Sequence, residues 1–180
     1  MNGIQGPAQI QLVPLSEFGL GQVAVVRNKA IDAMVSDTMA KLKLQRHELV
    51  VRDIRAADDF SDYTYEDYGE VAGAAANVYE TMTTGTMGDQ RWIGIFGVKD
   101  NSDDRVVSAL KFNVGGGDRA IWQLQALNDE DGRVGFSPGV IIIPQNAPYT
   151  ISRYILQADV GVQIVLKGIV VEPRGRVLSP

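Results

Sequence analysis

The sequence contains no cysteine and a single histidine, His47. Without cysteine there can be no disulfide framework, no thiolate zinc site and no thiol nucleophile. One histidine also excludes a histidine-rich zinc site, and no G-x-S-x-G sequence marks a serine that His47 could activate. We therefore expect no enzyme activity and no catalytic, cofactor-binding or metal-ligating residues.

Long apolar runs are also missing. No stretch approaches the roughly 20 apolar residues that a membrane-spanning helix needs. Residues 1–20 lack a basic segment followed by an apolar block, so we expect no signal peptide. These features predict a protein that is made and used in a cytoplasm or carried inside a particle, without membrane contact.

Positive charge is scarce and scattered. The 180 residues carry a formal net charge of −5, whereas proteins that follow nucleic-acid phosphates normally show a basic patch or stripe. With 45% hydrophobic and 22% charged residues, the composition is that of an ordinary globular chain. We expect a folded domain that binds no nucleic acid directly.

Residues 1–21 are interpreted as an extended N-terminal arm, because glycine and proline recur in them. The arm is nevertheless apolar, so we expect it to lie on a surface supplied by its own domain or by a neighbouring subunit. Its candidate contact residues are Ile10, Leu12, Val13, Leu15 and Phe18.

Residues 22–57 are predicted to form a helix followed by a short strand. Val26, Ala30 and Met34 begin an apolar stripe at helical spacing within residues 22–44. Residues 48–55 read as the strand. The stripe is expected to pack in the core, with a docking face for a partner as the alternative.

Residues 58–90 are interpreted as a connecting region that begins with an acidic stretch, 58–70. Its tyrosines suit a protein interface, where tyrosine is enriched; its carboxylates leave Ca²⁺ binding open, as do those of residues 129–131. For residues 71–88, which are small and permissive, we expect a short helix and a loop. The candidate contact residues of the acidic stretch are Tyr63, Tyr65 and Tyr68.

From residue 91 the pattern changes to that of strands. Residues 106–114 alternate with period two, and polar turns follow at intervals of roughly 8–12 residues, as in a sandwich or barrel. Further strands are expected within residues 92–98, 120–126, 140–143, 149–157 and 161–171. The predicted fold is mainly β with an N-terminal helix (α+β overall), its residues 91–180 forming an antiparallel β-sandwich, with the jelly-roll as the specific form considered.

Three classes of function remain open on these residues. The first is a structural assembly protein, and the second is a carbohydrate- or ligand-binding sandwich in which Trp92 or a tyrosine patch is exposed. Trp122 lies on the apolar register of its strand and is expected in the core. The third is a hydrolase that uses paired carboxylates, which converge in space and not in sequence.

Two segments of the C-terminal sequence carry a resemblance: VIIIPQNAPYTISRYIL, over residues 140–156, and VGVQIVLKGIVVEPRG, over residues 160–175. They resemble small virion structural proteins of tailed bacteriophages. These are capsid decoration (cement) or tail-accessory proteins. The resemblance implies a non-catalytic homo-oligomer that stabilises or decorates an assembled capsid. Its implied partners are the major capsid protein or other virion proteins, and its implied location is the virion.

Overall fold

A computed structural model gives the fold and describes residues 7–60, 69–70, 76–102, 105–129, 132–157 and 161–176. The helical elements are α1 (Leu15–Leu42), η1 (Arg46–Glu48), α2 (Ala56–Asp59), η2 (Gln125–Asp129) and η3 (Arg174–Arg176). The strands are β1 (Ala8–Gln11), β2 (Val13–Pro14), β3 (Leu49–Asp53), β4 (Gly69–Glu70), β5 (Val78–Thr86), β6 (Trp92–Asp100), β7 (Val107–Val114), β8 (Gly117–Gln123), β9 (Val134–Ile143), β10 (Pro148–Ile155), β11 (Gly161–Val162) and β12 (Ile164–Pro173).

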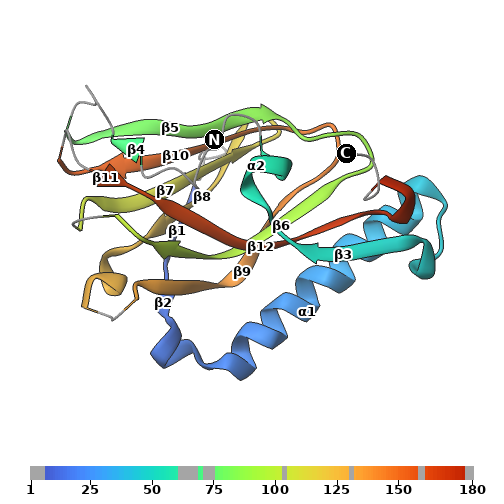
Figure 1. The fold of residues 1–180 in the computed structure, drawn as a ribbon, viewed down its shortest axis with the longest axis horizontal. Coiled ribbons are helices and arrows are strands. Elements are labelled where there is room, and N and C mark those ends of the chain that lie inside the picture. The colour runs from blue at the N-terminus through green and yellow to red at the C-terminus, as the bar shows by residue number, and fades with distance from the viewer. Residues whose placement is uncertain are drawn as a thin grey trace, which may run out of the picture.

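Ten of these strands form two five-stranded sheets (Figure 1). Sheet A has the order β1-β8-β7-β10-β5, and sheet B has the order β2-β9-β6-β12-β3. All pairings within them are antiparallel except that of β1 with β8. The main core cluster draws buried side chains from both sheets, among them Ile95, Phe112 and Trp122. The expectation of a mainly β chain with one N-terminal helix is confirmed.

Helix α1 lies across the outer face of sheet B and creates a second core (Figure 1). Val26, Ala30 and Met34 are buried against strand residues such as Trp92 and Ile169. The approach is close at Gly94, where an added Cβ would lie 3.0 Å from the Met34 Cε. The predicted apolar stripe is therefore a core face, as expected.

Strand β6 has both faces covered, by the inter-sheet core and by α1. This explains its unbroken apolar run, because a strand buried on both sides cannot alternate with polar residues. Strand β7, in contrast, has one face open and alternates. The expected strands within residues 92–98, 106–114, 120–126, 140–143, 149–157 and 161–171 are all present, with shifted ends.

The helix begins at Leu15, seven residues before the predicted start at Gln22. One turn forms over Leu15–Phe18, and the backbone then breaks at Gly19, whose φ of 73° favours glycine. Phe18 stacks on Phe136 of β9 with ring centroids 5.8 Å apart. The glycine-rich sequence thus encodes a bend between two helical pieces, where we expected the end of an arm.

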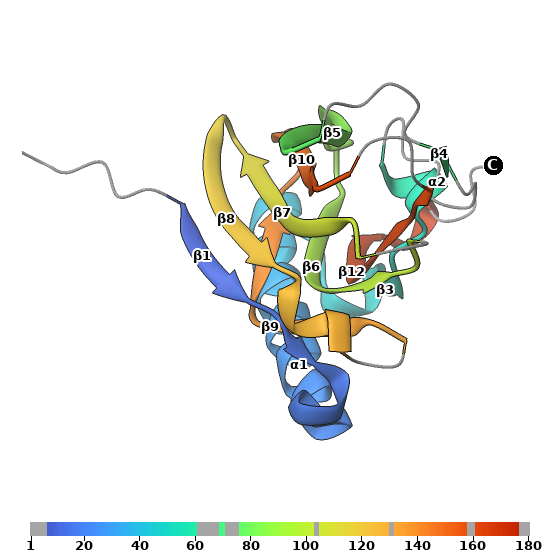
Figure 2. The same ribbon diagram turned by 90° about the vertical axis from the view of Figure 1, so that its left-hand side faces the viewer.

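The remainder of the predicted arm joins both sheets at one edge. Strand β1 pairs with β8, as Figure 2 shows, and β2 pairs with β9. Between them Leu12 is completely buried in the inter-sheet core, and its N–H donates to the Gln123 carbonyl at 3.1 Å. Residues 8–14 therefore lie on their own domain.

The helix and loop predicted for residues 71–88 are wrong over residues 78–86. This segment is β5, which pairs along its whole length with β10. Its valine and threonines have high β propensity. The small residues that precede them favoured the prediction of a helix and a loop instead. Strands β1, β2, β3 and β5 all precede residue 91 and belong to the same two sheets as the later strands.

Candidate interaction surface

The outer face of sheet A carries no described helix. In Figure 1 this sheet is the upper layer, and α1 lies on the opposite side of the molecule. Its half-buried or exposed residues include Thr84, Lys111 and Thr150, and the two threonine hydroxyls lie 2.9 Å apart. A strand face that is rich in hydroxyl groups and remains uncovered is a candidate contact surface.

Two tyrosines from neighbouring strands meet at one end of this face. Tyr79 of β5 and Tyr154 of β10 occupy paired positions, with ring centroids 5.1 Å apart in an edge-to-face arrangement. The Lys111 ammonium lies 5.0 Å from the Tyr79 ring centroid. Burial, helped by Tyr154 and Asp118, raises the pKa of Tyr79 above its usual value.

An exposed aliphatic side chain follows Tyr154 along the chain: Leu156 is 44% exposed, and Tyr79 itself is 40% exposed. We call Tyr79, Lys111, Tyr154 and Leu156 the tyrosine patch. It borders β5, the edge strand of sheet A, which pairs only with β10 among the described strands. An exposed apolar patch beside an edge strand is a typical site of protein association.

A second exposed apolar pair lies on α1. Leu20 is 78% exposed and Val25 is 45% exposed, just beyond the bend at Gly19. Both residues belong to the helix and not to a strand. The pair therefore provides a natural comparison for the tyrosine patch.

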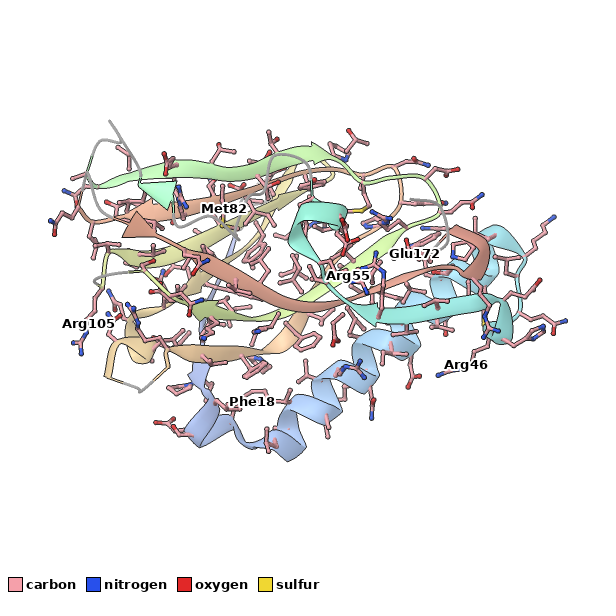
Figure 3. The ribbon with its side chains drawn as sticks, in the orientation of Figure 1. Phe18, Arg46, Arg55, Met82, Arg105 and Glu172 are labelled. Atoms are coloured by element: carbon pink, nitrogen blue, oxygen red, sulfur yellow. The ribbon has the colours of Figure 1, made fainter. Side chains whose placement is uncertain are left out.

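The strongest electrostatic cluster lies on sheet B, beside its edge strand β3. The Arg52 guanidinium donates to both carboxylate oxygens of Asp59, at 2.6 and 2.8 Å, and to Glu172 at 2.8 Å. Arg91 reaches the same two acids, and the buried Glu172 lies on β12 (Figure 3). The hydrogen bonds from Arg52 to Asp59 raise the pKa of Arg52 above its ordinary value.

This cluster is a structural clamp. Its four charges compensate one another, and the Arg55 N–H also donates to Asp59 at 2.7 Å. Every carboxylate oxygen in it accepts a hydrogen bond from an arginine. The cluster holds α2 against β3 and β12.

Both tryptophans are fully buried, contrary to the idea of an exposed Trp92. The Trp92 indole N–H donates to Asp37 at 2.8 Å beneath α1. Burial opposes ionisation of Asp37, but hydrogen bonds from Lys41 and Trp92 outweigh it and lower the pKa of Asp37. Trp122 lies in the inter-sheet core, as expected.

The structure divides the predicted contact residues. Leu12 is buried and cannot contact a partner, whereas Ile10, Val13, Leu15 and Phe18 are partly exposed on their own domain. The other candidates, Tyr63, Tyr65 and Tyr68, lie outside the described residues.

His47 is exposed in η1, at the end of the molecule where α1 finishes. No group of three or more His, Cys, Asp or Glu residues that could hold a metal ion occurs among the described residues. Most of the acidic stretch and residues 130–131 lie outside this part of the chain. Within the described part, no helix is long and apolar enough to cross a membrane.

Sequence reasoning missed the tyrosine patch, because Tyr79 and Tyr154 are 75 positions apart. Only the pairing of β5 with β10 brings them together. The available signal was the β-branched content of residues 78–86, which would have predicted a strand with Tyr79 near its start.

No family model, no curated protein and no solved structure matches this chain.

Proposed function

We propose that this chain is a non-catalytic structural protein of a viral particle that binds an assembled capsid and stabilises or decorates it. Its partners would be the major capsid protein or other virion proteins, and it would act as a homo-oligomer. The proposal rests on the strand order of the two sheets, on the tyrosine patch and on the resemblance of residues 140–175 to phage virion proteins.

The strand order is the observation that carries the proposal. The eight strands of the two sheets other than β1 and β2 can be lettered B to I in chain order, from β3 to β12 without β4 and β11. Sheet B then reads B-I-D-G and sheet A reads C-H-E-F. All these neighbours are antiparallel. This order supports a jelly-roll sandwich, an architecture used by viral capsid domains and lectins.

The link from a strand order to a virion role is one of fold analogy. The tyrosine patch adds a surface that belongs to this chain. Tyrosine gives a large contact area for little loss of side-chain entropy, and β5 offers backbone groups on its free side. A patch of this kind on a rigid sheet suits contact between copies or with a shell.

The test is the solution mass of the intact chain by size-exclusion chromatography with light scattering. We expect a defined oligomer that dissociates when Tyr79→Ser and Leu156→Ser are combined. The matched control combines Leu20→Ser and Val25→Ser on α1 and should leave the mass unchanged. A wild-type chain that stays monomeric at high concentration would contradict the proposal of a homo-oligomer.

Deletion of residues 1–20 is a poorer test. Leu12 fills the inter-sheet core and β1 and β2 close one edge, so this truncation would destabilise the fold itself. Side-chain changes on exposed residues separate assembly from folding.

A carbohydrate- or ligand-binding module is the second candidate, because jelly-rolls also include lectins and the exposed Tyr79 could stack on a sugar ring. The test is to measure binding of the chain to a panel of glycans and to ask whether that binding depends on the exposed tyrosine. Flat binding curves across the panel would remove this candidate and leave the structural role.

A further inference from the structure

A groove of about 310 Å³ lies on the outer face of sheet B, beside α1. Phe96 of β6 and Phe136 of β9 line its apolar part. Arg27 of α1, Asp53 at the end of β3 and Lys167 of β12 supply its charges. This groove lies on the other sheet from the tyrosine patch, so the two surfaces can be tested separately.

Burial along β12 shows how far along this strand α1 covers the outer face of sheet B. From Ile169 to Glu172 every residue is buried, because one face meets the inter-sheet core and the other meets α1. Before Ile169, the side chains of Val165 and Lys167 are only half-buried, and both line the groove. The groove therefore begins where the second core stops.

The backbone edge of β12 is open at the same place. Strand β3 pairs with residues 169–173, and its last backbone bond runs from the Ile54 N–H to the Gly168 carbonyl at 3.2 Å. Backbone groups alternate in direction along a strand, so those of Leu166 point to the same side as those of Gly168. No described strand continues β3 there, and Leu166 lines the groove.

The charges of the groove favour an acidic occupant. Arg27 has Asp53 as a partner, but the N–O distance is 3.4 Å and the side chains are 40% and 83% exposed. Lys167 makes no ion pair with any described residue. Two cations and one anion line a groove in a chain whose net charge is −5, so a carboxylate would be attracted locally.

We propose that this groove binds an extended, acidic and apolar segment of a partner polypeptide, which pairs with β12 in continuation of β3. Alternate side chains of such a segment would reach the apolar floor and the Lys167 ammonium, as in other cases of strand addition. The inference rests on the proposed function, because it names the chemistry of the partner segment.

The experiment is an amide NMR titration of the full chain with a blocked six-residue peptide of alternating leucine and aspartate. Controls are the same peptide with asparagine in place of aspartate, and hexanoate as a small apolar carboxylate. Peptide concentrations up to about 1 mM detect weak binding. The variants are Lys167→Glu and, as a matched control on an exposed face of α1, Lys29→Glu.

We expect shifts centred on the amides of Ile54, Leu166 and Gly168. The asparagine peptide and Lys167→Glu should each weaken binding about tenfold or more, the effect of losing one charged hydrogen bond, whereas Lys29→Glu should not. Shifts elsewhere, or none, would overturn the inference. Equal shifts with hexanoate would also overturn it, since a small carboxylate would then be the occupant.

Failure of this inference is distinguishable from failure of the proposed function. Lys167→Glu should leave the solution mass of the chain unchanged, because the tyrosine patch is on sheet A. If the peptide does not bind but the tyrosine-patch variant still dissociates the oligomer, only the groove proposal is contradicted.

Discussion

The two sheets differ in what covers their outer faces. Sheet B presents Trp92, Phe96 and Ile169 outward, and α1 of the same chain buries them. Sheet A presents hydroxyl groups and the tyrosine patch, and no described element covers it. The difference teaches that this chain covers the outer face of sheet B with its own helix, except at the groove beside α1, and leaves the outer face of sheet A available for contact.

The largest effect on stability is expected from a substitution that weakens the covered outer face of sheet B. Met34 is fully buried between α1 and sheet B, and it lies against Gly94. Met34→Ala should lower the free energy of unfolding by about 2–5 kcal/mol, because it leaves a cavity. Urea denaturation followed by circular dichroism measures the change, and a loss near zero would show that α1 does not close the second core.

The ion pairs of the two sheets should also differ in how much they contribute to the free energy of unfolding. Asp59→Asn should cost about 3 kcal/mol, since it leaves the arginines of the sheet B clamp without a buried carboxylate partner. The Glu80–Arg153 pair on sheet A is more exposed, and Glu80→Gln should cost about 0.2–1 kcal/mol. Parallel denaturation of both variants checks the order, and equal costs would contradict the assignment of a buried clamp to sheet B.

The tyrosine patch should matter more for assembly than for folding. Tyr79→Ser removes an exposed ring and its contact with Tyr154, so we expect a loss of about 1 kcal/mol or less in unfolding free energy. Denaturation of the dissociated protein at low concentration measures this. A loss as large as that of Met34→Ala would mean that the patch is part of the core.

The smallest expected effect concerns pH. The lowered pKa of Asp37 means that its ionised form stabilises the fold above the ordinary carboxyl value of 3.8 and that this contribution is lost as pH falls through the lowered pKa. Because the Asp37–Lys41 pair is exposed, Asp37→Asn should cost under about 0.5 kcal/mol near neutrality. The difference from wild type should vanish in acid, and a difference that grows there would contradict the sign.

The sequence predicted the elements whose patterns are set by burial. The period-two alternation of β7 and the apolar run of β6 identified strands, and the stripe from Val26 to Met34 identified the helix. Residues 78–86 were missed because pairing with β10, and not local periodicity, makes them a strand. Leu12 was placed in an extended arm lying on a surface, because composition alone does not show that β1 and β2 join two sheets.

The candidate sites were the least predictable part. Tyr79, Tyr154 and Lys111 come from three strands, and the groove brings together residues from α1 and four strands. Such convergence follows from strand order, which a single sequence does not reveal. The same holds for the clamp, whose Glu172 lies 120 positions from Arg52.

Hydrogen exchange measured by mass spectrometry at low and high protein concentration tests the central claim most directly. If sheet A is the contact face, amides of β5 and the end of β10 should gain protection as concentration rises, while those around Leu20 and Val25 of α1 should not change. Protection gained at the start of α1, with β5 unchanged, would contradict the claim that the uncovered sheet makes the contact.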